Sequence, residues 1–336
     1  MENTIKVLIT GADGVLGNNL VRELLKRNYE VSVLLIDKNT EAIGLLNLPV
    51  KRFYGNILDQ KLLSDVIKGH EVVIHAAAST QVYPPRSKQI NDINIEGTKN
   101  IINSCLQNKI QRLIHVGTAN SFAPGNIKHP GNEKNEYTGL KYGLDYMDSK
   151  YEAQKLVLDA VREKQLGALI VNPTFMIGPY DTKPSSGALL LGLYHKKIPG
   201  YTTGSKNYIA VKDAAIAISN AITMGEIGEC YVLGNHNLTY KEAFTIISDE
   251  IGVKCPKILL PSFIVKFYGR LNSFFGRLFN LNPSVTKELA QLSCEDHCYS
   301  GEKAREKLNM PCTELNIAVK ESFDWFKENN YLSVTN

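Results

Sequence analysis

The sequence predicts an α/β protein built on a doubly wound parallel sheet, with a smaller C-terminal lobe. Three observations support this fold class. Residues 6–25 give a strand, a glycine-rich turn and a helix in direct succession. Short apolar runs rich in β-branched residues then alternate with amphipathic helical patterns, as in a parallel sheet covered by helices. Beyond Pro173, repeated proline and glycine residues break this alternation, which predicts a less regular lobe.

The first strand is the apolar run 7–9, and it leads directly into three glycines spaced G-x-x-G-x-x-G. Gly11 permits a tight turn, Gly14 lets backbone N–H groups approach a pyrophosphate, and Gly17 lets the helix lie close to the strand. Apolar residues at helical spacing follow, so the helix begins inside this segment. The pattern is typical of a dinucleotide-binding, Rossmann-type unit, with its first helical turn also contacting the cofactor through Val15 and Leu16.

The following elements repeat this unit. We expect about seven strands in the main sheet. The expected strands after the first are 31–36, 50–54, 71–75, 112–116 and 168–171, and the two long helices are 89–108 and 142–163.

The domain organisation follows from the change of pattern after Pro173. We expect residues 1–175 to form the dinucleotide-binding domain, with segments of about 207–235 returning to it. Residues 176–206 and 236–336 then form the smaller substrate-binding lobe.

Composition excludes several classes of function. The chain has 336 residues, is 43% hydrophobic and 21% charged, and carries 38 Lys and Arg against 34 Asp and Glu. This mild excess does not predict a nucleic-acid partner. The chain opens MENTIK, directly before a strand, without a signal-peptide pattern, and its six cysteines have no framework spacing. We therefore expect a cytoplasmic protein with reduced thiols and no bound metal.

Two further segments are candidates for the cofactor site. Asp37 and Lys38 follow the second strand, about where an acidic residue binds the adenosine ribose, although Lys38 suits a 2′-phosphate equally well. Two solvated charges in a turn are the simpler alternative. Three small residues, Ala76, Ala77 and Ala78, end the fourth strand and allow a ligand to approach the backbone.

Tyr146 and Lys150 are candidates for acid–base chemistry because a spacing of four places them on one helix face. A neighbouring Lys⁺ and an oxidised nicotinamide are expected to bring the phenol pKa towards neutrality. Tyr137 has the same spacing across a broken loop, and Tyr151 has it about 140° further round the helix. Thr118, after the fifth strand, offers a hydroxyl to the substrate oxygen.

The motifs around Tyr146 resemble those of the extended short-chain dehydrogenase/reductase family, within the NAD-dependent epimerase/dehydratase superfamily. The resemblance runs over nearly the whole chain, and it implies a homodimer formed through the helices 89–108 and 142–163. The matching motifs are TGADGVLG at 10–17, GNI at 55–57, HAAA at 75–78, NIEGT at 94–98, Thr118 with YMDSKYEAQ at 146–154, NPTFMIGP at 172–179, YIAVKDA at 208–214, and the closing stretch 303–325.

This resemblance is greatest to the dihydroflavonol reductase and 3β-hydroxysteroid dehydrogenase branch. It implies reversible reduction of a ketone, with Tyr146 as proton donor, Lys150 on the nicotinamide ribose and Thr118 orienting the carbonyl; Ser121 is a weaker candidate. Position 36 has neither the early Asp of NAD-preferring members nor the Arg of many NADP-preferring members, so the cofactor is NADP or NAD, with a lean to NADP through Lys38. The cofactor contacts that it implies further along the chain are Asn56, Ile57, Asn94, Pro173 and Met176.

The remaining features leave alternatives open. Residues 258–281 carry five Phe among basic residues, and they form either a buried part of the lobe, a wall of an apolar substrate pocket, or a surface for a membrane or partner. Cys294, His297 and Cys298 could be metal ligands on a helix but lack matched partners, and His115 is expected to be packed in its strand.

We therefore expect an NAD(P)-dependent oxidoreductase acting on the ketone or secondary alcohol of an apolar, ring-containing small molecule. A sugar-nucleotide epimerase or dehydratase of the same family is the alternative enzyme, and a non-catalytic NAD(P)-binding sensor is the alternative outside catalysis. The intact Tyr146–Lys150 pair argues against the sensor.

Overall fold

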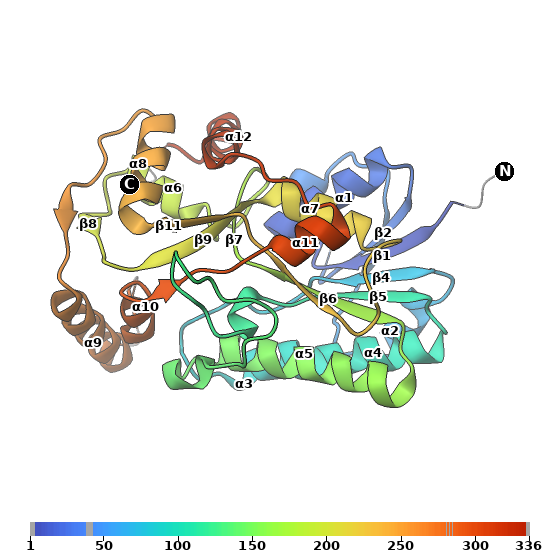
Figure 1. Ribbon diagram of the computed structural model, residues 1–336. Coiled ribbons are helices and arrows are strands. Elements are labelled where there is room, and N and C mark those ends of the chain that lie inside the picture. The colour runs from blue at the N-terminus through green and yellow to red at the C-terminus, as the bar shows by residue number, and fades with distance from the viewer. Residues whose placement is uncertain (1–3, 38–42, 280, 282, 284, 334–336) are drawn as a thin grey trace.

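A seven-stranded parallel sheet forms the centre of the computed structural model, which describes residues 4–37, 43–279, 281, 283 and 285–333 (Figure 1). The strand order is β10-β6-β5-β4-β1-β2-β3, and all six strand pairs are parallel. The order reverses between β1 and β4, which is where ligands bind in such sheets. The strands are β1 (Lys6–Thr10), β2 (Glu30–Leu35), β3 (Lys51–Tyr54), β4 (Val72–His75), β5 (Arg112–Val116), β6 (Ala168–Pro173) and β10 (Cys230–Leu233).

Helices cover both faces of this sheet, and the predicted fold class is confirmed. Figure 1 shows α1, α7 and α11 above the sheet and α2, α4 and α5 below it. Each face has its own apolar core, since the strands are buried on both sides. The helices are α1 (Val15–Lys26), α7 (Val211–Asn220) and α11 (Glu302–Leu308) on one face, and α2 (Gln60–Ile67), α3 (Lys88–Asn91), α4 (Gly97–Gln107) and α5 (Asp145–Lys164) on the other.

The rest of the chain lies beyond the carboxyl ends of the strands, around a second, four-stranded sheet with a third apolar core. In that sheet β9 pairs with β11, β13 and β7, and β8 pairs separately with β12. The strands are β7 (Phe175–Ile177), β8 (Gly200–Tyr201), β9 (Ser205–Ala210), β11 (His236–Thr239), β12 (Ile258–Leu259) and β13 (Asp296–His297). The helices are α6 (Ala188–Tyr194), α8 (Tyr240–Glu250), α9 (Ser262–Phe279), α10 (Lys287–Leu292) and α12 (Leu315–Glu328).

Both predicted long helices need correction. The helix that ends near residue 163 begins at Asp145, not at residue 142, because Gly143 adopts φ +65° and Leu144 is extended. The helix predicted over 89–108 contains the π-helical turn Asp92–Glu96 between α3 and α4. Such turns insert one extra residue and are frequent at functional sites.

Two other expectations are also wrong. The strand predicted over 168–171 continues to Pro173, because Leu233 of β10 pairs alongside it. Burial of the Phe-rich stretch is contradicted, since Phe263, Phe267 and Phe274 are each more than half exposed.

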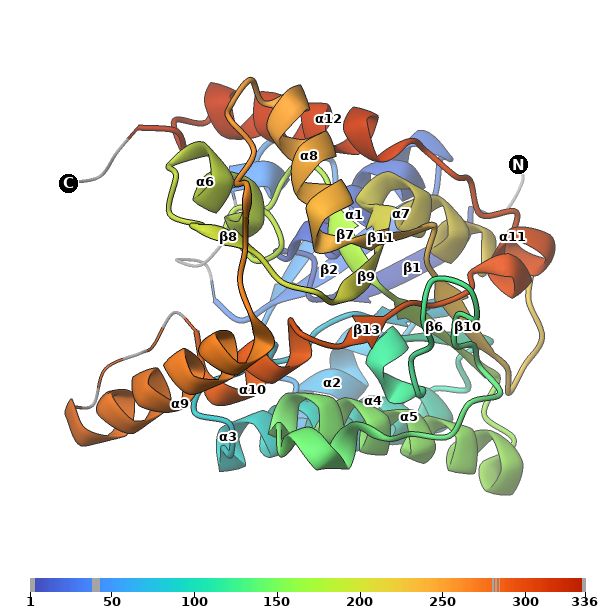
Figure 2. The ribbon, with the colours of Figure 1, turned by 60° about the vertical axis from the view of Figure 1, so that its left-hand side comes forward.

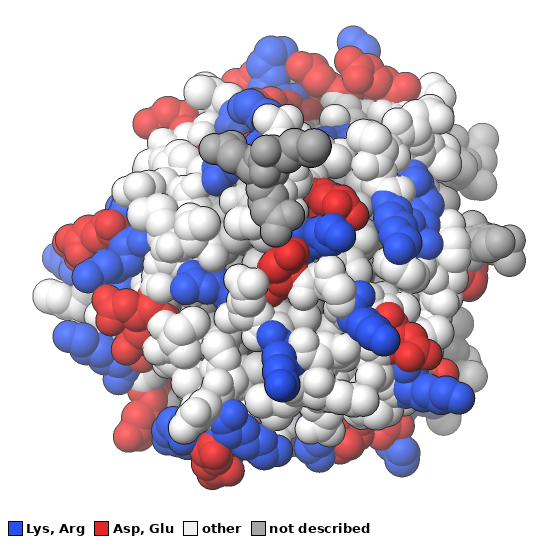
Figure 3. Space-filling model, turned by 90° about the vertical axis from the view of Figure 1, so that its right-hand side faces the viewer, with Lys and Arg blue, Asp and Glu red and all other residues white. Residues whose placement is uncertain are grey.

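Charge is distributed evenly over the face that Figure 3 shows, where Lys and Arg alternate with Asp and Glu. This agrees with the small formal net charge of +4. The face carries no continuous patch of one sign of the kind that binds nucleic acid.

Candidate active site

The glycine segment between β1 and α1 forms a cradle that fits a pyrophosphate. Gly11 has φ +74°, and a Cβ atom there would lie 2.6 Å from the backbone nitrogen of Ala77, in the loop after β4. A Cβ at Gly17 would lie 2.2 Å from the Gly11 carbonyl oxygen, so both positions require glycine for packing. A Cβ at Gly14, the N-cap of α1, would meet nothing nearer than 3.6 Å. The open side of Gly14 faces the positive end of the helix, where an anion binds favourably.

The other predicted cofactor contacts surround this cradle. Ala76, Ala77 and Ala78 follow β4 and are half-buried, with the Ala77 amide donating to the Thr10 hydroxyl at 3.3 Å. After β3, Asn56 is exposed and accepts a hydrogen bond from the Leu58 amide.

Packing explains two of the neighbouring motif residues. Ile57 is buried, and a Cβ at Gly97 would lie 2.5 Å from its Cδ1 atom, so the small residue on α4 makes room for it. Leu16 is buried beneath the glycine turn, whereas Val15 is half-buried at the start of α1.

Asp37 lies just beyond β2 and is partly exposed, preceded by Ile36, which is 69% exposed. Lys38, the basis for the lean to NADP, lies outside the described residues.

Asn94 lies in the π-helical turn and is buried. Its side-chain amide donates to the Ser79 carbonyl at 3.0 Å and to the Ser149 hydroxyl at 2.9 Å, and its oxygen accepts from the Ser79 amide at 2.7 Å. The Asn94 side chain therefore joins the loop after β4 to the first turns of α5, one residue from Lys150.

Tyr146 and Thr118 form the centre of the site. Tyr146 lies in the first turn of α5, and its phenol lies beside the Thr118 hydroxyl just beyond the end of β5. Burial raises the pKa of Tyr146 above its ordinary value, and the neighbouring Thr118 hydroxyl acts in the opposite direction. The expected lowering of this pKa by Lys150 together with an oxidised nicotinamide stays a prediction, because it depends on bound cofactor. The phenol is protonated at neutral pH and can act as an acid.

Lys150 lies one helical turn beyond Tyr146 and is buried. Its Nζ donates to the Val116 carbonyl oxygen at 2.6 Å, at the carboxyl end of β5. Desolvation lowers the pKa of this ammonium group to about 8. Its charge helps in turn to lower the pKa of His75 to about 3, although burial of the imidazole is the larger cause. A buried lysine with these neighbours is a functional-site candidate on physical grounds.

The two other Tyr–Lys pairs lie elsewhere: Tyr137 and Lys141 precede α5, and Tyr151 and Lys155 lie on another face of that helix. Tyr137 stacks on Tyr151 with ring centroids 4.2 Å apart and donates to Asp148 at 2.6 Å. Lys155 is exposed and pairs with Glu152 at 3.2 Å. Neither pair reaches β5, so geometry distinguishes Tyr146 from both.

Asn172 positions Thr118 from the neighbouring strand, a role that the sequence analysis missed. Its side-chain amide donates to the Thr118 carbonyl at 3.0 Å and to Gln154 Oε1 at 2.7 Å. The next residue is Pro173, buried at the end of β6, and Met176 on β7 is half-buried. The NPTFMIGP motif, which begins at Asn172, could have pointed to this role, but the resemblance linked the motif only to the cofactor.

Lys206 is a second cation in the interior, half-buried, that the sequence analysis missed. It lies on β9, where it pairs in register with His297 of β13, and its Nζ is 4.4 Å from the Phe175 ring centroid. Burial lowers the pKa of Lys206 to about 8. Among the described residues it forms no ion pair. A single lysine in the sequence does not indicate a functional role until the pairing of the second sheet shows where its side chain lies.

The remaining candidates do not converge on Tyr146. Within the part of the chain that the structure describes, the buried Ser121 hydroxyl has no hydrogen-bond partner, and neither ring nitrogen of the buried His115 has one. His297 lies in β13 rather than on a helix, contrary to the expectation for this segment. Within the described residues, no group of three or more His, Cys, Asp and Glu side chains is arranged to hold a metal ion.

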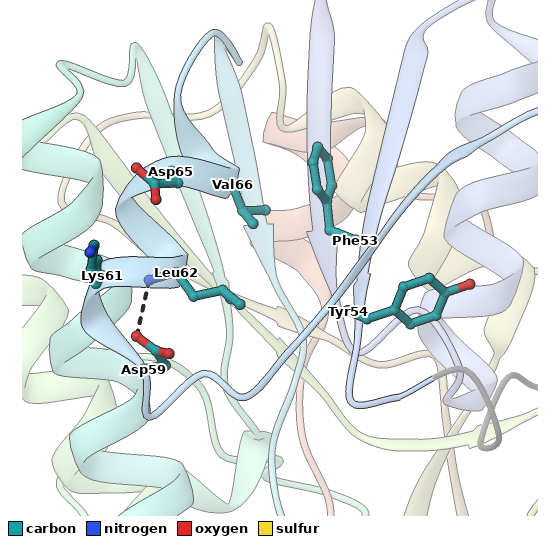
Figure 4. A pocket seen from close by; sticks show the side chains of 7 residues that line it. All are labelled: Phe53, Tyr54, Asp59, Lys61, Leu62, Asp65 and Val66. Carbon is teal, nitrogen blue, oxygen red and sulfur yellow. Dashed lines mark hydrogen bonds between the residues drawn. The ribbon is translucent and has the colours of Figure 1, made fainter.

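A surface hollow of about 450 Å³ lies between β3 and α2, away from these residues (Figure 4). None of the predicted site residues lines it. Its wall mixes apolar and charged groups that do not converge on one point. The lining residues are Phe53, Tyr54, Asp59, Lys61, Leu62, Asp65 and Val66.

Residues 7–234 match the model of the NAD dependent epimerase/dehydratase family, and the chain therefore belongs to this family. Among its relatives is a Synechocystis sp. protein that carries the name dihydroflavonol 4-reductase, 26% identical over 96% of this chain and 95% of its own. Another is the decarboxylating sterol-4-alpha-carboxylate 3-dehydrogenase of Mus musculus, 25% identical over 96% of this chain and 91% of its own. A dTDP-D-glucose 4,6-dehydratase of Dictyostelium discoideum is 30% identical over 68% of this chain and 58% of its own.

Solved structures show the same fold. The crystal structure of gox2253 has a TM-score of 0.86 at 27% identity, covering 98% of this chain and all of its own. The NAD⁺ complex of WbmH from Bordetella bronchiseptica has a TM-score of 0.75 at 18% identity, with 98% of this chain and all of its own covered. The predicted family is confirmed, and so is an NAD(P)-dependent enzyme acting at a CH–OH or C=O group.

Proposed function

We propose that this protein is an NAD(P)-dependent oxidoreductase that reduces the ketone, or oxidises the secondary alcohol, of an apolar, ring-containing small molecule. The observation that carries this proposal is the position of the Tyr146 phenol beside the Thr118 hydroxyl, next to the buried Lys150, which donates to the Val116 carbonyl at the end of β5. It pairs a phenol that is protonated at neutral pH with a hydroxyl at the carboxyl ends of the strands, where ligands bind in such sheets.

The proposed chemistry assigns one task to each side chain. Thr118 holds the substrate oxygen, and Tyr146, protonated at neutral pH, donates the proton that this oxygen needs as the alcohol forms. A bound nicotinamide supplies the hydride to the carbonyl carbon. Lys150 provides a cation for the ribose hydroxyls, and with the oxidised ring it favours the phenolate in the reverse direction. Asn94 holds α5 against the loop after β4 and so fixes both side chains.

Two findings support an apolar substrate. Tyr146 packs in an apolar cluster with Met147, Val82 and Leu292, so its surroundings favour carbon-rich surfaces. The reductase and sterol relatives align over 96% of this chain, including its C-terminal lobe, whereas the dTDP-glucose dehydratase aligns over 68%.

One observation favours the second candidate function, a sugar-nucleotide epimerase or dehydratase. Lys206 is a cation on the lobe side with no ion-pair partner among the described residues, and a diphosphate would supply that partner. The packing around Tyr146 outweighs this single group, so the ketone oxidoreductase remains our proposal.

The test is oxidation of NADPH and NADH by the purified protein with a panel of steroid, flavanone and small aryl ketones, run beside UDP- and dTDP-sugars. Ketone-dependent cofactor oxidation is expected. Conversion of a sugar nucleotide without net change of cofactor, and silence with every ketone, would instead establish the epimerase or dehydratase. Tight cofactor binding without either reaction would favour the sensor.

The same assay tests which cofactor the protein uses. We propose NADP or NAD, with a preference for NADP. The comparison of KM for NADPH and NADH decides between them. A homodimer through α4 and α5 is also proposed, supported by a groove of about 340 Å³ between these helices, and light scattering of the purified protein tests it.

A further inference from the structure

Helix α9 attaches to the protein through its smallest residues. Gly269, Ser273 and Gly276 are the buried residues of this helix. A Cβ at Gly269 would lie 2.6 Å from the Cβ of Ala290 on α10, and the Ser273 hydroxyl accepts a hydrogen bond from the Lys287 amide at 2.8 Å. In both ribbon views α9 lies at the outer edge of the molecule alongside α10 (Figures 1 and 2).

The large apolar residues of α9 point away from the protein. At about 100° per residue they occupy an arc of about 160° on the helix. Phe263 is 74% exposed, and the adjoining residues of β12 are exposed as well. Monomeric proteins rarely expose so large a continuous apolar surface, and such surfaces usually mark a contact with a partner or a membrane. We call this set the α9 face: Phe263, Ile264, Phe267, Tyr268, Leu271, Phe274, Phe275, Leu278 and Phe279.

A row of positive charge borders the α9 face. Lys266, Arg270 and Arg277 are four and seven residues apart, which places them within about 40° of one another on the helix, between the buried residues and the apolar arc. Residues 251–287 contain no Asp or Glu, and their six basic residues are these three with Lys254, Lys257 and Lys287.

We propose that the α9 face docks on the surface of an anionic lipid bilayer. Helices with one broad apolar face, bordered by Lys and Arg, lie in the plane of the membrane interface, with aromatic rings among the acyl chains and cations at the headgroup phosphates. A second copy of this chain fits the face less well, because a two-fold interface through α9 would bring the same basic row against itself. Among the described residues, no helix is long and apolar enough to cross a membrane.

The docking surface adjoins the candidate active site. Helix α10, on which α9 packs, carries Leu292, which joins the apolar cluster around Tyr146. A Cβ at Gly276 would also lie 3.1 Å from the hydroxyl of Tyr83, in the loop after β4. This position suits uptake of an apolar substrate from the bilayer. That consequence rests on the proposed function, whereas docking itself does not.

The experiment is flotation of the full-length protein with vesicles of phosphatidylcholine alone and with vesicles that also contain phosphatidylglycerol. The wild type is expected to float with the anionic vesicles, and added salt is expected to weaken this binding. Phe263→Ser/Phe267→Ser/Phe274→Ser should lower the affinity at least about tenfold. Lys266→Gln/Arg270→Gln/Arg277→Gln should remove mainly the preference for anionic vesicles.

The matched control replaces three exposed apolar residues elsewhere, Ile127→Ser/Ile227→Ser/Ile317→Ser, and should float like the wild type. Circular dichroism and thermal melting of each variant confirm its fold, since all substituted side chains lie at the surface. Wild-type protein that stays with the soluble fraction would overturn the proposal, as would equal loss in the control. A dimer that the phenylalanine variant dissociates, without vesicle binding, would assign the α9 face to self-association. Loss of flotation with unchanged ketone reduction in detergent would separate docking from the proposed function.

Discussion

Replacing Lys150 by methionine is expected to stabilise the protein near neutral pH while removing most of its turnover. Folding takes the ammonium group from water into the interior and lowers its pKa from 10.5 to about 8. This difference corresponds to about 3 kcal/mol of folding free energy that the charged lysine costs at pH 7. Methionine has a similar length and no charge, so it avoids that cost. It also leaves the Val116 carbonyl without its hydrogen-bond donor, and this loss cancels about 1–2 kcal/mol of the stability gained.

The pH dependence gives the sharper form of this prediction. Between pH 8 and 10.5 the unfolded chain holds the lysine proton more tightly than the folded protein does, so the wild type gains stability as the pH rises through this window. Lys150→Met lacks this gain. Its advantage of about 1–2 kcal/mol at pH 7 should therefore fall, and reverse by about pH 10.5. Between pH 7 and 10.5 the difference in stability between the two proteins should change by about 3 kcal/mol, which for 336 residues corresponds to about 4–5 °C in Tm.

The assay is thermal unfolding of wild type and variant in matched buffers from pH 7 to 10.5. Lys155→Met is the control, because this lysine lies on the same helix but is exposed, and its Tm difference should not change across the window. A Lys150→Met protein that is less stable at pH 7, by an amount independent of pH, would refute the buried-cation argument.

Four other predictions test the site. Tyr146→Phe should lower kcat about 10²–10⁴-fold with cofactor binding retained, whereas Tyr151→Phe, which keeps the stacked ring, should change kcat little. Gly14→Ala should weaken cofactor binding about 10–100-fold at nearly unchanged Tm, since its Cβ meets no protein atom within 3.6 Å and enters the anion cradle. Gly17→Ala should lower Tm by about 2–4 °C, because its Cβ would lie 2.2 Å from a carbonyl oxygen. Lys206→Met should leave the turnover of a neutral ketone within about twofold and reduce that of an anionic substrate at least about tenfold.

Each of these has an outcome that contradicts it. An active Tyr146→Phe beside an inactive Tyr151→Phe would move the site to the other helix face. If Gly14→Ala and Gly17→Ala lower Tm equally in the absence of cofactor, Gly14 is required for packing, as Gly17 is, and not for binding the cofactor. Loss of neutral-ketone turnover in Lys206→Met would place that lysine within the reaction itself.

The sequence predicted the main sheet well because its signals are local. Each strand is a short apolar run, and the glycine turn has one geometry that suits it. Where prediction failed, contacts distant in sequence decide the structure. β6 extends to Pro173 because β10 pairs beside it, about sixty residues later in the chain. The start of α5 depends on Gly143 in a left-handed conformation, and an isolated glycine gives only a weak signal of this.

The sequence predicted the motif residues of the candidate site but not the residues that surround them and hold them in place. Tyr146, Lys150 and Thr118 could be named because their spacing and strand ends lie in the sequence. Asn172, which holds Thr118 from the next strand, could not be assigned this role before the strand order was known. Lys206 lies in the second sheet, whose pairing joins segments about ninety residues apart and leaves no periodic signal.

The orientation of the Phe-rich stretch shows a further limit. Its hydrophobicity favoured burial, but the glycines at 269 and 276 reveal which side of α9 packs on the protein. A pattern of large and small residues alone does not predict which face of a helix packs on the protein. The contact with α10 decides this, and it leaves the aromatic residues outside.

The most direct test of the central claim is transfer of deuterium from nicotinamide cofactor deuterated at C4 to a ketone substrate. The wild-type protein is expected to place deuterium on the carbon that becomes the alcohol, detected by mass spectrometry, and Tyr146→Phe is expected to lose this transfer while still binding cofactor. Deuterium that never leaves the cofactor with any ketone, together with sugar-nucleotide conversion at constant cofactor, would contradict the account.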